Sequence, residues 1–327
     1  MTNIPSERAM NPSTGYFDLQ VNGYAGVDFN QDDLTADGLH VACELMASHG
    51  VAGILATIIT EHVETMCRRL ANLVRLREQD ELARRLIVGL HIEGPFINET
   101  DGYRGAHPAD AVRPADEEAM RRLLNAGGGL TRLVTLAPER DAGFRVTQML
   151  AKQGIVVSAG HTDASLDDLR GAIDAGLGMF THVGNGCPMK MHRHDNIIQR
   201  ALSMHERLWL CFIADGAHVP FVALGNYLRA AGIERAIVVT DAIAAAGLGP
   251  GRYKLGRWDM VIGEDMVARA PDLSHLVGSA CPMPQATARL RDQLHLDAET
   301  ISKLTEVNPR KAVGVAVTSS PRSLDRW

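Results

Sequence analysis

Residues 154–188 constrain the fold of this chain more than any other stretch. Two short apolar runs, 155–158 and 179–181, lead directly to His161 and His182, and residues 165–175 between them have the pattern of an amphipathic helix. This pattern predicts a β-α-β unit, whose two parallel strands point their carboxyl ends the same way. In barrels built from such units that end carries the chemistry. We therefore expect the two histidines to lie side by side.

A single histidine at a strand end is more often a hydrogen-bonded structural residue than a metal ligand. Two histidines at matching positions of neighbouring strands converge on one point, and this favours a shared metal ion.

Apolar strands alternate with helical segments along most of the chain. The expected strands are residues 16–21, 53–60, 86–92, 130–136, 155–158, 179–181, 208–214 and 236–240. The expected helices are residues 33–48, 63–85, 115–125, 143–153, 165–175, 222–231, 284–295 and 299–304. Eight strands in this alternation predict an α/β protein with a (β/α)8 TIM barrel rather than an open doubly wound sheet.

The remaining segments complete the expected organisation. Residues 251–270 contain short strands with glycine turns, which predict a β-hairpin excursion after strand eight. We expect an N-terminal lead-in over residues 1–15, the barrel over residues 16–315 and a C-terminal tail over residues 316–327.

Composition excludes several classes of function. The formal net charge is -6 and the lysines and arginines are scattered, so no basic stripe invites nucleic acid or an anionic membrane. The five cysteines lack CxxC spacing, which argues against a disulfide framework and against a thiolate metal site. No glycine-rich phosphate loop follows a strand. Without a signal peptide or a membrane-spanning run, we expect a cytoplasmic protein.

Polar side chains gather at the carboxyl ends of the expected strands. They are Gln20, Asn22, Glu93, His161, His182, Asp215, His218 and Asp241. A set of one glutamate and two histidines leaves a divalent ion an open position for water, which is typical of catalytic zinc. We therefore expect Glu93, His161 and His182 to bind the ion and Asp241 to carry the proton.

These residues also have structural interpretations. Glu93 precedes a Gly-Pro turn and could cap a nearby helix, and Asp241 could be the N-cap of the segment that follows it. His91 lies on the same face of its strand as Glu93 and could replace it as a ligand, although its deeper position favours local hydrogen bonding.

Ten motifs follow one another from about Phe17 to Gly314. They are FDLQVNGYAGVDF, GLHIEGPFIN, GAHP, VTLAPE, GIVVSAGHTDAS, THVGNGCPM, IADGAHVP, VVTDAIAAAG, GSACPMPQA and NPRKAVG. In these motifs the chain resembles the amidohydrolase superfamily and, within it, the N-acetylglucosamine-6-phosphate deacetylases. The resemblance implies metal-dependent hydrolysis of N-acetylglucosamine-6-phosphate to glucosamine-6-phosphate and acetate.

The resemblance also implies roles for individual residues. It assigns Glu93, His161 and His182 to the metal and Asp241 to acid/base catalysis. His107 would polarise the acetyl carbonyl. The substrate-binding residues would be Asn185, Gly186, His218 and Arg193. In a homodimer, Arg193 would bind the phosphate group of the substrate held by the neighbouring subunit. Gln20 and Asn22 replace the two histidines that bind a second metal in many amidohydrolases, so one ion is expected, and Gln20 is expected to contact the substrate. Glutamate and histidine ligands suit zinc, which we expect first, and also iron or cobalt.

The chain departs from the family pattern in two places. Residues 192–196 read HRHDN where the family has a Gly-Arg-Glu-Pro-like turn, so the phosphate site is rebuilt or the substrate differs, and Arg193 could be a solvated surface arginine. The β-sandwich domain that the family builds from both chain ends is expected to be absent or vestigial.

Three rival functions follow. The first is hydrolysis of an unphosphorylated N-acetyl sugar or another N-acyl substrate, the second is a non-catalytic sugar-binding barrel, and the third is a metal-free barrel isomerase.

Overall fold

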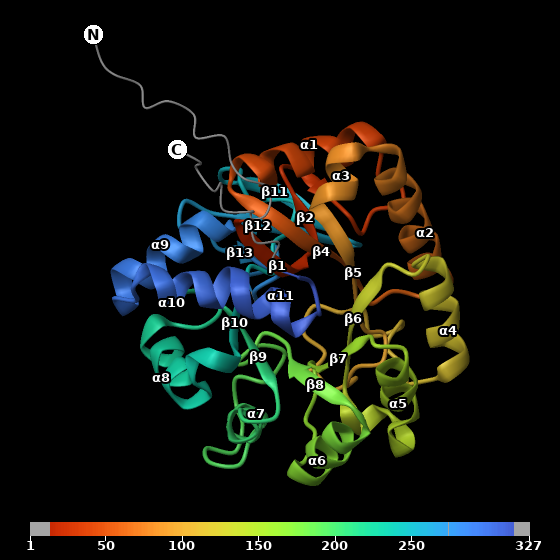
Figure 1. Cartoon of the computed structure of the whole chain (residues 1–327), viewed down its shortest axis with the longest axis vertical. Helices are drawn as coiled ribbons and strands as arrows, with labels where there is room; N and C mark the ends of the chain where they lie inside the picture. The colour runs from red at the N-terminus through yellow and green to blue at the C-terminus, as the bar shows by residue number, and fades with distance from the viewer. Residues whose placement is uncertain (1–13, 274, 317–327) are drawn as a thin grey trace, which may run out of the picture.

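A computed structural model describes residues 14–273 and 275–316 of the chain. The expected lead-in and tail therefore lie almost wholly outside the described residues. Eight parallel strands form one sheet in chain order, and a parallel backbone bridge between Val21 and Ala242 brings its two edges together (Figure 1). They are β1 (Tyr16–Val21), β4 (Val51–Ile59), β5 (Ile87–Glu93), β6 (Thr131–Leu136), β7 (Val156–Ala159), β8 (Leu177–Phe180), β9 (Trp209–Ile213) and β10 (Ala236–Val239). The predicted (β/α)8 barrel is confirmed.

Helices surround the barrel (Figure 1). They are α1 (Ala36–Ser48), α2 (Val63–Gln79), α3 (Glu81–Leu86), α4 (Glu117–Ala126), α5 (Arg145–Lys152), α6 (Leu166–Ala175), α7 (Ile197–Ser203), α8 (Phe221–Ala231), α9 (Met283–Leu294), α10 (Ala298–Ser302) and α11 (Asn308–Ala312). Short 3₁₀ turns lie at Pro138–Arg140, Ala142–Phe144 and Ile233–Arg235, and a π-helical turn, Lys303–Val307, joins α10 to α11.

Several helices differ from the prediction, among them α11, which was not expected. The single helix expected over residues 63–85 is broken at Asp80, because the Asp80 side chain accepts a hydrogen bond from the backbone N–H of Ala83 and caps α3. Helix α7 was not expected. It begins after Asn196, whose Oδ1 accepts hydrogen bonds from the backbone N–H groups of Ile198 and Gln199, both at 3.1 Å.

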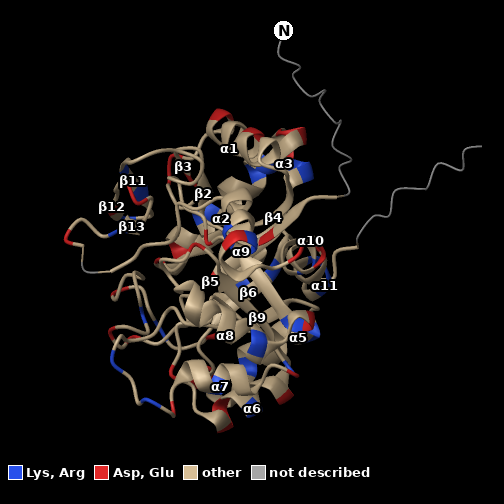
Figure 2. Cartoon of the chain, turned by 90° about the vertical axis from the view of Figure 1, so that its left-hand side faces the viewer, with Lys and Arg blue, Asp and Glu red and all other residues tan. Residues whose placement is uncertain are grey.

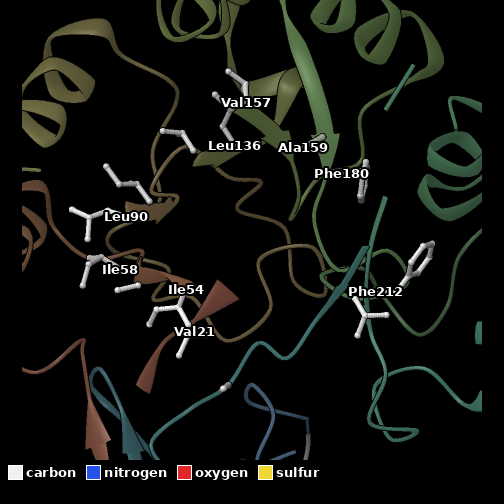
Figure 3. Packing of buried hydrophobic residues seen from close by; sticks show 14 of the residues in the cluster. Val21, Ile54, Ile58, Leu90, Leu136, Val157, Ala159, Phe180 and Phe212 are labelled. Carbon is white, nitrogen blue, oxygen red and sulfur yellow. The ribbon is translucent and has the colours of Figure 1, made fainter. Parts of the chain in front are cut away.

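Side chains of successive strand residues alternate between two apolar cores. Val157, Phe180 and Phe212 belong to the larger core (Figure 3). This core also includes apolar residues of the surrounding helices. Leu133, Met179 and other strand residues form a smaller core inside the barrel. This alternation follows from the two-residue period of a strand, which places neighbouring side chains on opposite faces.

The inward face of the barrel changes character along the strands. Leu133 and Met179 are followed two residues later by Thr135 and Thr181, which are buried and polar. An apolar plug therefore supports a polar layer near the carboxyl ends of the strands, where functional sites of such barrels lie.

The hairpin predicted after strand eight is confirmed as a three-stranded antiparallel sheet. It consists of β11 (Gly251–Leu255), β12 (Trp258–Ile262) and β13 (Ala268–Arg269). Figure 2 shows this sheet at one end of the barrel, with α10 and α11 at the other. A second small ribbon, β2 (Gly23–Tyr24) with β3 (Val27–Asp28), follows β1.

Within the described residues, no helix has both the length and the apolar character needed to cross a membrane.

Candidate active site

The predicted ligands lie at the carboxyl ends of neighbouring strands. Glu93 is the last residue of β5, and His161 and His182 each lie two residues beyond the ends of β7 and β8. Both histidines have left-handed backbone conformations, with φ of 51° and 27°. Asp241 lies two residues beyond β10 and also has a positive φ, 52°. Non-glycine residues rarely adopt this conformation, and such residues concentrate at functional sites.

Glu93, His161 and His182 form a buried cluster. The Nε2 atoms of His182 and His161 lie 3.0 and 3.5 Å from Oε1 of Glu93. One ligand atom from each of the three residues lies within 4.8 Å of the other two. Burial alone would raise the pKa of Glu93, but the neighbouring His161 and His182 hold it well below its usual range. The carboxylate is therefore ionised and can act as a ligand.

Two separations within the cluster suit a tetrahedral metal ion. Ligand atoms about 2.0–2.1 Å from such an ion lie roughly 3.3 Å apart, close to the two separations from Glu93. The Nδ1 atom of His161 lies 2.9 Å from the backbone carbonyl of Tyr103, so it donates its proton there and leaves the lone pair of Nε2 facing the cluster. The glutamate and two histidines that the sequence selected thus meet with the correct atoms inward.

Gln20 of β1 contacts the cluster through Glu93. Its Nε2 donates to both carboxylate oxygens of Glu93, at 3.0 and 3.1 Å, and its Oε1 accepts from the Thr181 hydroxyl at 2.9 Å. The side chain is buried. Because both ends of its amide are bonded to protein, the geometry favours orientation of Glu93 over the substrate contact that was predicted for Gln20.

His91 does not join the cluster. Its Nδ1 and Nε2 lie 3.3 Å from the Thr57 hydroxyl and 2.8 Å from the Thr135 hydroxyl. Burial lowers its pKa to about 4, so the ring is neutral near pH 7. The expectation that His91 forms local hydrogen bonds is confirmed.

Asp241 faces the cluster with one oxygen fixed. Its Oδ1 accepts a hydrogen bond from Nδ2 of Asn22 at 2.7 Å. Burial, together with repulsion by the Glu93 carboxylate, raises the pKa of Asp241 above its usual value. A raised pKa makes a carboxylate a stronger proton acceptor, and the protonated carboxyl group can return the proton.

His107 lies beside His161. Their Nε2 atoms are 3.1 Å apart and their ring centroids 4.3 Å apart. Burial, with repulsion by His161, holds the pKa of His107 well below its usual range, so the ring is neutral. Its Nδ1 is buried and has no hydrogen-bond partner among the described residues. The loop after β5 thus brings His107 to the cluster.

His218 is fixed by Asp215, which follows β9. The Nδ1 of His218 donates to Oδ2 of Asp215 at 2.7 Å, and the Ser279 hydroxyl donates to the same oxygen at 2.9 Å. Burial would raise the pKa of Asp215, but its bond to His218 lowers it, so the carboxylate is ionised and orients the ring. The hydrogen bond to Nδ1 leaves Nε2 of His218 for another partner.

The other predicted substrate residues divide into two groups. Asn185 and Gly186 adjoin the cluster, and a Cβ at Gly186 would lie 2.9 Å from Nδ1 of His161. Arg193 lies in an exposed loop, and none of the contacts formed by the described residues joins it to the cluster.

Sequence reasoning missed several supporting contacts at this site. Asn22 was not assigned to Asp241, and neither the Tyr103 carbonyl nor the Thr181 hydroxyl was considered. A contact made by a backbone carbonyl cannot be recognised from the sequence. Asn22 could have been recognised, because it follows Gln20 of β1 by two residues and so lies on the same inward face.

Comparison with known proteins places this geometry in a family. No protein-family model matches the chain. An N-acetylglucosamine-6-phosphate deacetylase of Bacillus subtilis is 30% identical over 313 residues, which cover 95% of this chain and 77% of the relative. The human enzyme of the same name is 31% identical over 308 residues, covering 92% of this chain and 74% of the relative.

Solved structures agree. A mutant of the Mycobacterium smegmatis N-acetyl-D-glucosamine-6-phosphate deacetylase, in complex with N-acetyl-D-glucosamine-6-phosphate, is 31% identical and superposes with a TM-score of 0.83, covering 92% of this chain and 77% of that one. The Pasteurella multocida deacetylase is 26% identical, with a TM-score of 0.80 over 92% of this chain and 76% of that one. The chain therefore belongs to the N-acetylglucosamine-6-phosphate deacetylase family of the amidohydrolase superfamily.

Proposed function

We propose that this chain hydrolyses the acetyl amide of N-acetylglucosamine-6-phosphate, giving glucosamine-6-phosphate and acetate. The observation that carries the proposal is the convergence of Glu93, His161 and His182 beside Asp241 in a chain of this family. The cluster would hold one divalent ion, for which we propose zinc, with iron or cobalt as alternatives. When bound, such an ion polarises a carbonyl and lowers the pKa of a bound water.

Asp241 moves the proton in this proposal. The carboxylate accepts a proton as water attacks the amide carbon, and then delivers it to the nitrogen as the C–N bond breaks. Asn22 holds Oδ1, so Oδ2 is the oxygen free for this transfer. Delivery matters because an unprotonated amine is a poor leaving group. We propose Gln20 and Asn22 as positioning residues for Glu93 and Asp241.

His107 would stabilise the developing oxyanion. A neutral imidazole keeps one N–H, and Nε2 of His107 faces the cluster. This nitrogen can donate a hydrogen bond to the carbonyl oxygen as its negative charge grows. Its low pKa suits this role, because the ring does not carry a charge that would repel the ion.

Substrate recognition completes the proposal. We propose that Asn185, Gly186 and His218 contact the sugar. We also propose a homodimer in which Arg193 binds the phosphate group of the substrate held by the neighbouring subunit. Support comes from the bond at Nδ1 of His218, which leaves its Nε2 without a hydrogen bond to the described residues, and from the exposed position of Arg193. We also propose that the barrel over residues 16–315 acts in the cytoplasm.

The decisive measurement is release of free amine from N-acetylglucosamine-6-phosphate and from N-acetylglucosamine by the zinc-loaded protein. We expect turnover of the phosphorylated sugar, and a kcat at least about a hundredfold lower in Asp241→Asn. Asp167→Asn, at an exposed aspartate of α6, is the matched control and should behave as the wild type. Absence of turnover of both sugars, with metal bound, would refute the proposal and favour a binding protein or another N-acyl substrate.

The role of Arg193 has its own test. Arg193→Gln should raise KM for the phosphorylated sugar by about tenfold or more, because it removes a charge-assisted hydrogen bond, and should leave KM for N-acetylglucosamine unchanged. A monomeric mass in light scattering would contradict the homodimer. Equal KM changes for both sugars would contradict phosphate binding.

A further inference from the structure

The small sheet β11–β13 covers part of the active-site end of the barrel. Its buried residues Leu255, Met260 and Ile262 form an apolar cluster with Ile59 at the end of β4 and with the segment after β10. Ala106, which directly precedes His107, packs against the same cluster. The sheet is therefore in contact with the loop that brings His107 to the cluster of Glu93, His161 and His182.

The turn between β11 and β12 is anchored to the barrel through its backbone. The N–H of Gly256 donates to Oδ2 of Asp28 at 2.6 Å, and its carbonyl accepts from Nε2 of Gln31 at 2.6 Å. Gly256 has a φ of 55°, a conformation that glycine adopts without strain. The turn thus has a fixed position relative to β3.

Arg257, the other residue of the turn, joins two loops that are distant in sequence. Its Nε donates to Oε2 of Glu61 at 2.8 Å, and its Nη2 donates to the other Glu61 oxygen. Its Nη1 donates to both oxygens of Asp110, at 3.0 and 3.1 Å. A guanidinium group can hold two carboxylates at once in this fixed geometry, whereas a lysine ammonium cannot.

The two carboxylates lie next to groups of the active site. Asp110 is three residues after His107, and Glu61 is two residues after Ile59, which pairs with Glu93 across β4 and β5. On its other side the His107 loop is held by Arg104, whose Nη1 donates to the His107 carbonyl at 2.9 Å.

We propose that Arg257 is a positioning residue for the reaction, which sets the His107 loop relative to the strand that carries Glu93. The inference rests on the proposed deacetylation, because positioning is measured through turnover. A purely structural role of Arg257 predicts a loss of stability without a separate loss of kcat. The Asp110 side chain is 58% exposed, and an ion pair of that exposure contributes only about 0–1 kcal/mol to stability. The Glu61 side chain is only 8% exposed, so its pair with Arg257 contributes more, and urea titration must separate that loss of stability from a loss of kcat. Small displacements of a catalytic group can nevertheless cost up to about a hundredfold in rate.

The test compares kinetics and loop dynamics in the zinc-loaded protein. Arg257→Gln should lower kcat about tenfold while KM changes less than about threefold, since His107 acts on the transition state. Asp110→Asn should act in the same direction. The double variant should lose less kcat than the product of the two single losses, because the Arg257–Asp110 pair is common to both. Asp110 also lies 3.1 Å from Nε2 of His62, a contact that only Asp110→Asn weakens. Arg257→Lys should recover part of kcat.

Hydrogen–deuterium exchange gives a readout that does not depend on turnover. Peptides covering residues 103–112 should exchange faster in Arg257→Gln than in the wild type. Arg269→Gln is the matched control, because Arg269 pairs with Asp265 within the same small sheet, and it should leave kcat and exchange unchanged.

Two outcomes would overturn the proposal. One is wild-type kcat and wild-type exchange over residues 103–112 in Arg257→Gln. The other is a loss of kcat that matches the fraction of unfolded protein in urea titration, which would indicate a structural role only. If the wild type turns over neither sugar, the proposed function fails. Hydrogen–deuterium exchange in Arg257→Gln then still tests the loop: faster exchange over residues 103–112 shows that Arg257 holds it, and unchanged exchange shows that it does not.

Discussion

Gly160 provides a quantitative test of the packing next to the cluster of Glu93, His161 and His182. It lies between β7 and His161, and a Cβ at this position would lie 2.3 Å from Cγ2 of Thr181 and 2.8 Å from Cγ2 of Thr135. Carbon atoms pack favourably at about 3.5–4.0 Å, so an added methyl group overlaps both by about 0.7 Å or more.

Neither threonine can turn away without losing a hydrogen bond. The Thr181 hydroxyl donates to Gln20 at 2.9 Å, and the Thr135 hydroxyl bonds Nε2 of His91 at 2.8 Å. We therefore expect Gly160→Ala to lower the free energy of unfolding by about 1–3 kcal/mol, the usual cost of overpacking. The same displacement should move His161 away from His182 and weaken zinc binding.

The assay is urea unfolding of the metal-free protein, together with zinc titration of the folded protein. The double variant Gly160→Ala, Thr181→Ser removes the nearer methyl group and keeps the hydroxyl that bonds Gln20. It should recover at least half of both losses, measured against Thr181→Ser alone. A Gly160→Ala protein with wild-type unfolding and zinc affinity would refute the reasoning, as would a double variant with no recovery.

Three further predictions concern stability. Burial raises the pKa of Asp18 from 3.8 to about 7, so the folded protein keeps a proton that the unfolded chain releases. The contribution of Asp18 to the free energy of unfolding of the metal-free protein should therefore decrease by about 3 kcal/mol as the pH rises from about 4 to about 7, and Asp18→Asn should flatten this slope in urea titrations at several pH values. Zinc at a hundred times its dissociation constant should raise the free energy of unfolding by about 2.7 kcal/mol, and an unchanged melting temperature after chelation would contradict a folded-state metal site. Two nitrogens of Arg310, Nε and Nη2, are buried without a hydrogen-bond partner among the described residues, although the group lies 4.6 Å from the ring of Phe17. Arg310→Met should stabilise the protein by about 1 kcal/mol in urea, and a lower midpoint would indicate that the cation–π contact outweighs the unpaired donors.

The strands, and the convergence of Glu93, His161 and His182, were predictable because both follow from short-range periodicity. An inward side chain recurs every second residue, so Glu93 and Asp241 at strand ends could be placed on one face before their contacts were known. Helix boundaries were less predictable. The apolar positions of α2 and α3 stay in step through Asp80, and only the capping geometry of that aspartate separates the two helices.

Contacts between distant segments were not predictable. Arg257 and Asp110 are 147 residues apart, and no local pattern indicates that they pair. Gln20 shows a related limit. Its inward position was expected, but an amide can bond substrate or protein equally well, and only the distances to Glu93 and Thr181 favour the protein.

The left-handed backbone of His161, His182 and Asp241 has a consequence for laboratory evolution. Each non-glycine residue held in this conformation costs about 1–3 kcal/mol, which glycine would relieve. A library selected for heat resistance alone should accumulate glycine at these three positions and lose the reaction. A library selected for turnover should keep the three residues and gain stability at other positions. The two selections would therefore give different sequences at these strand ends.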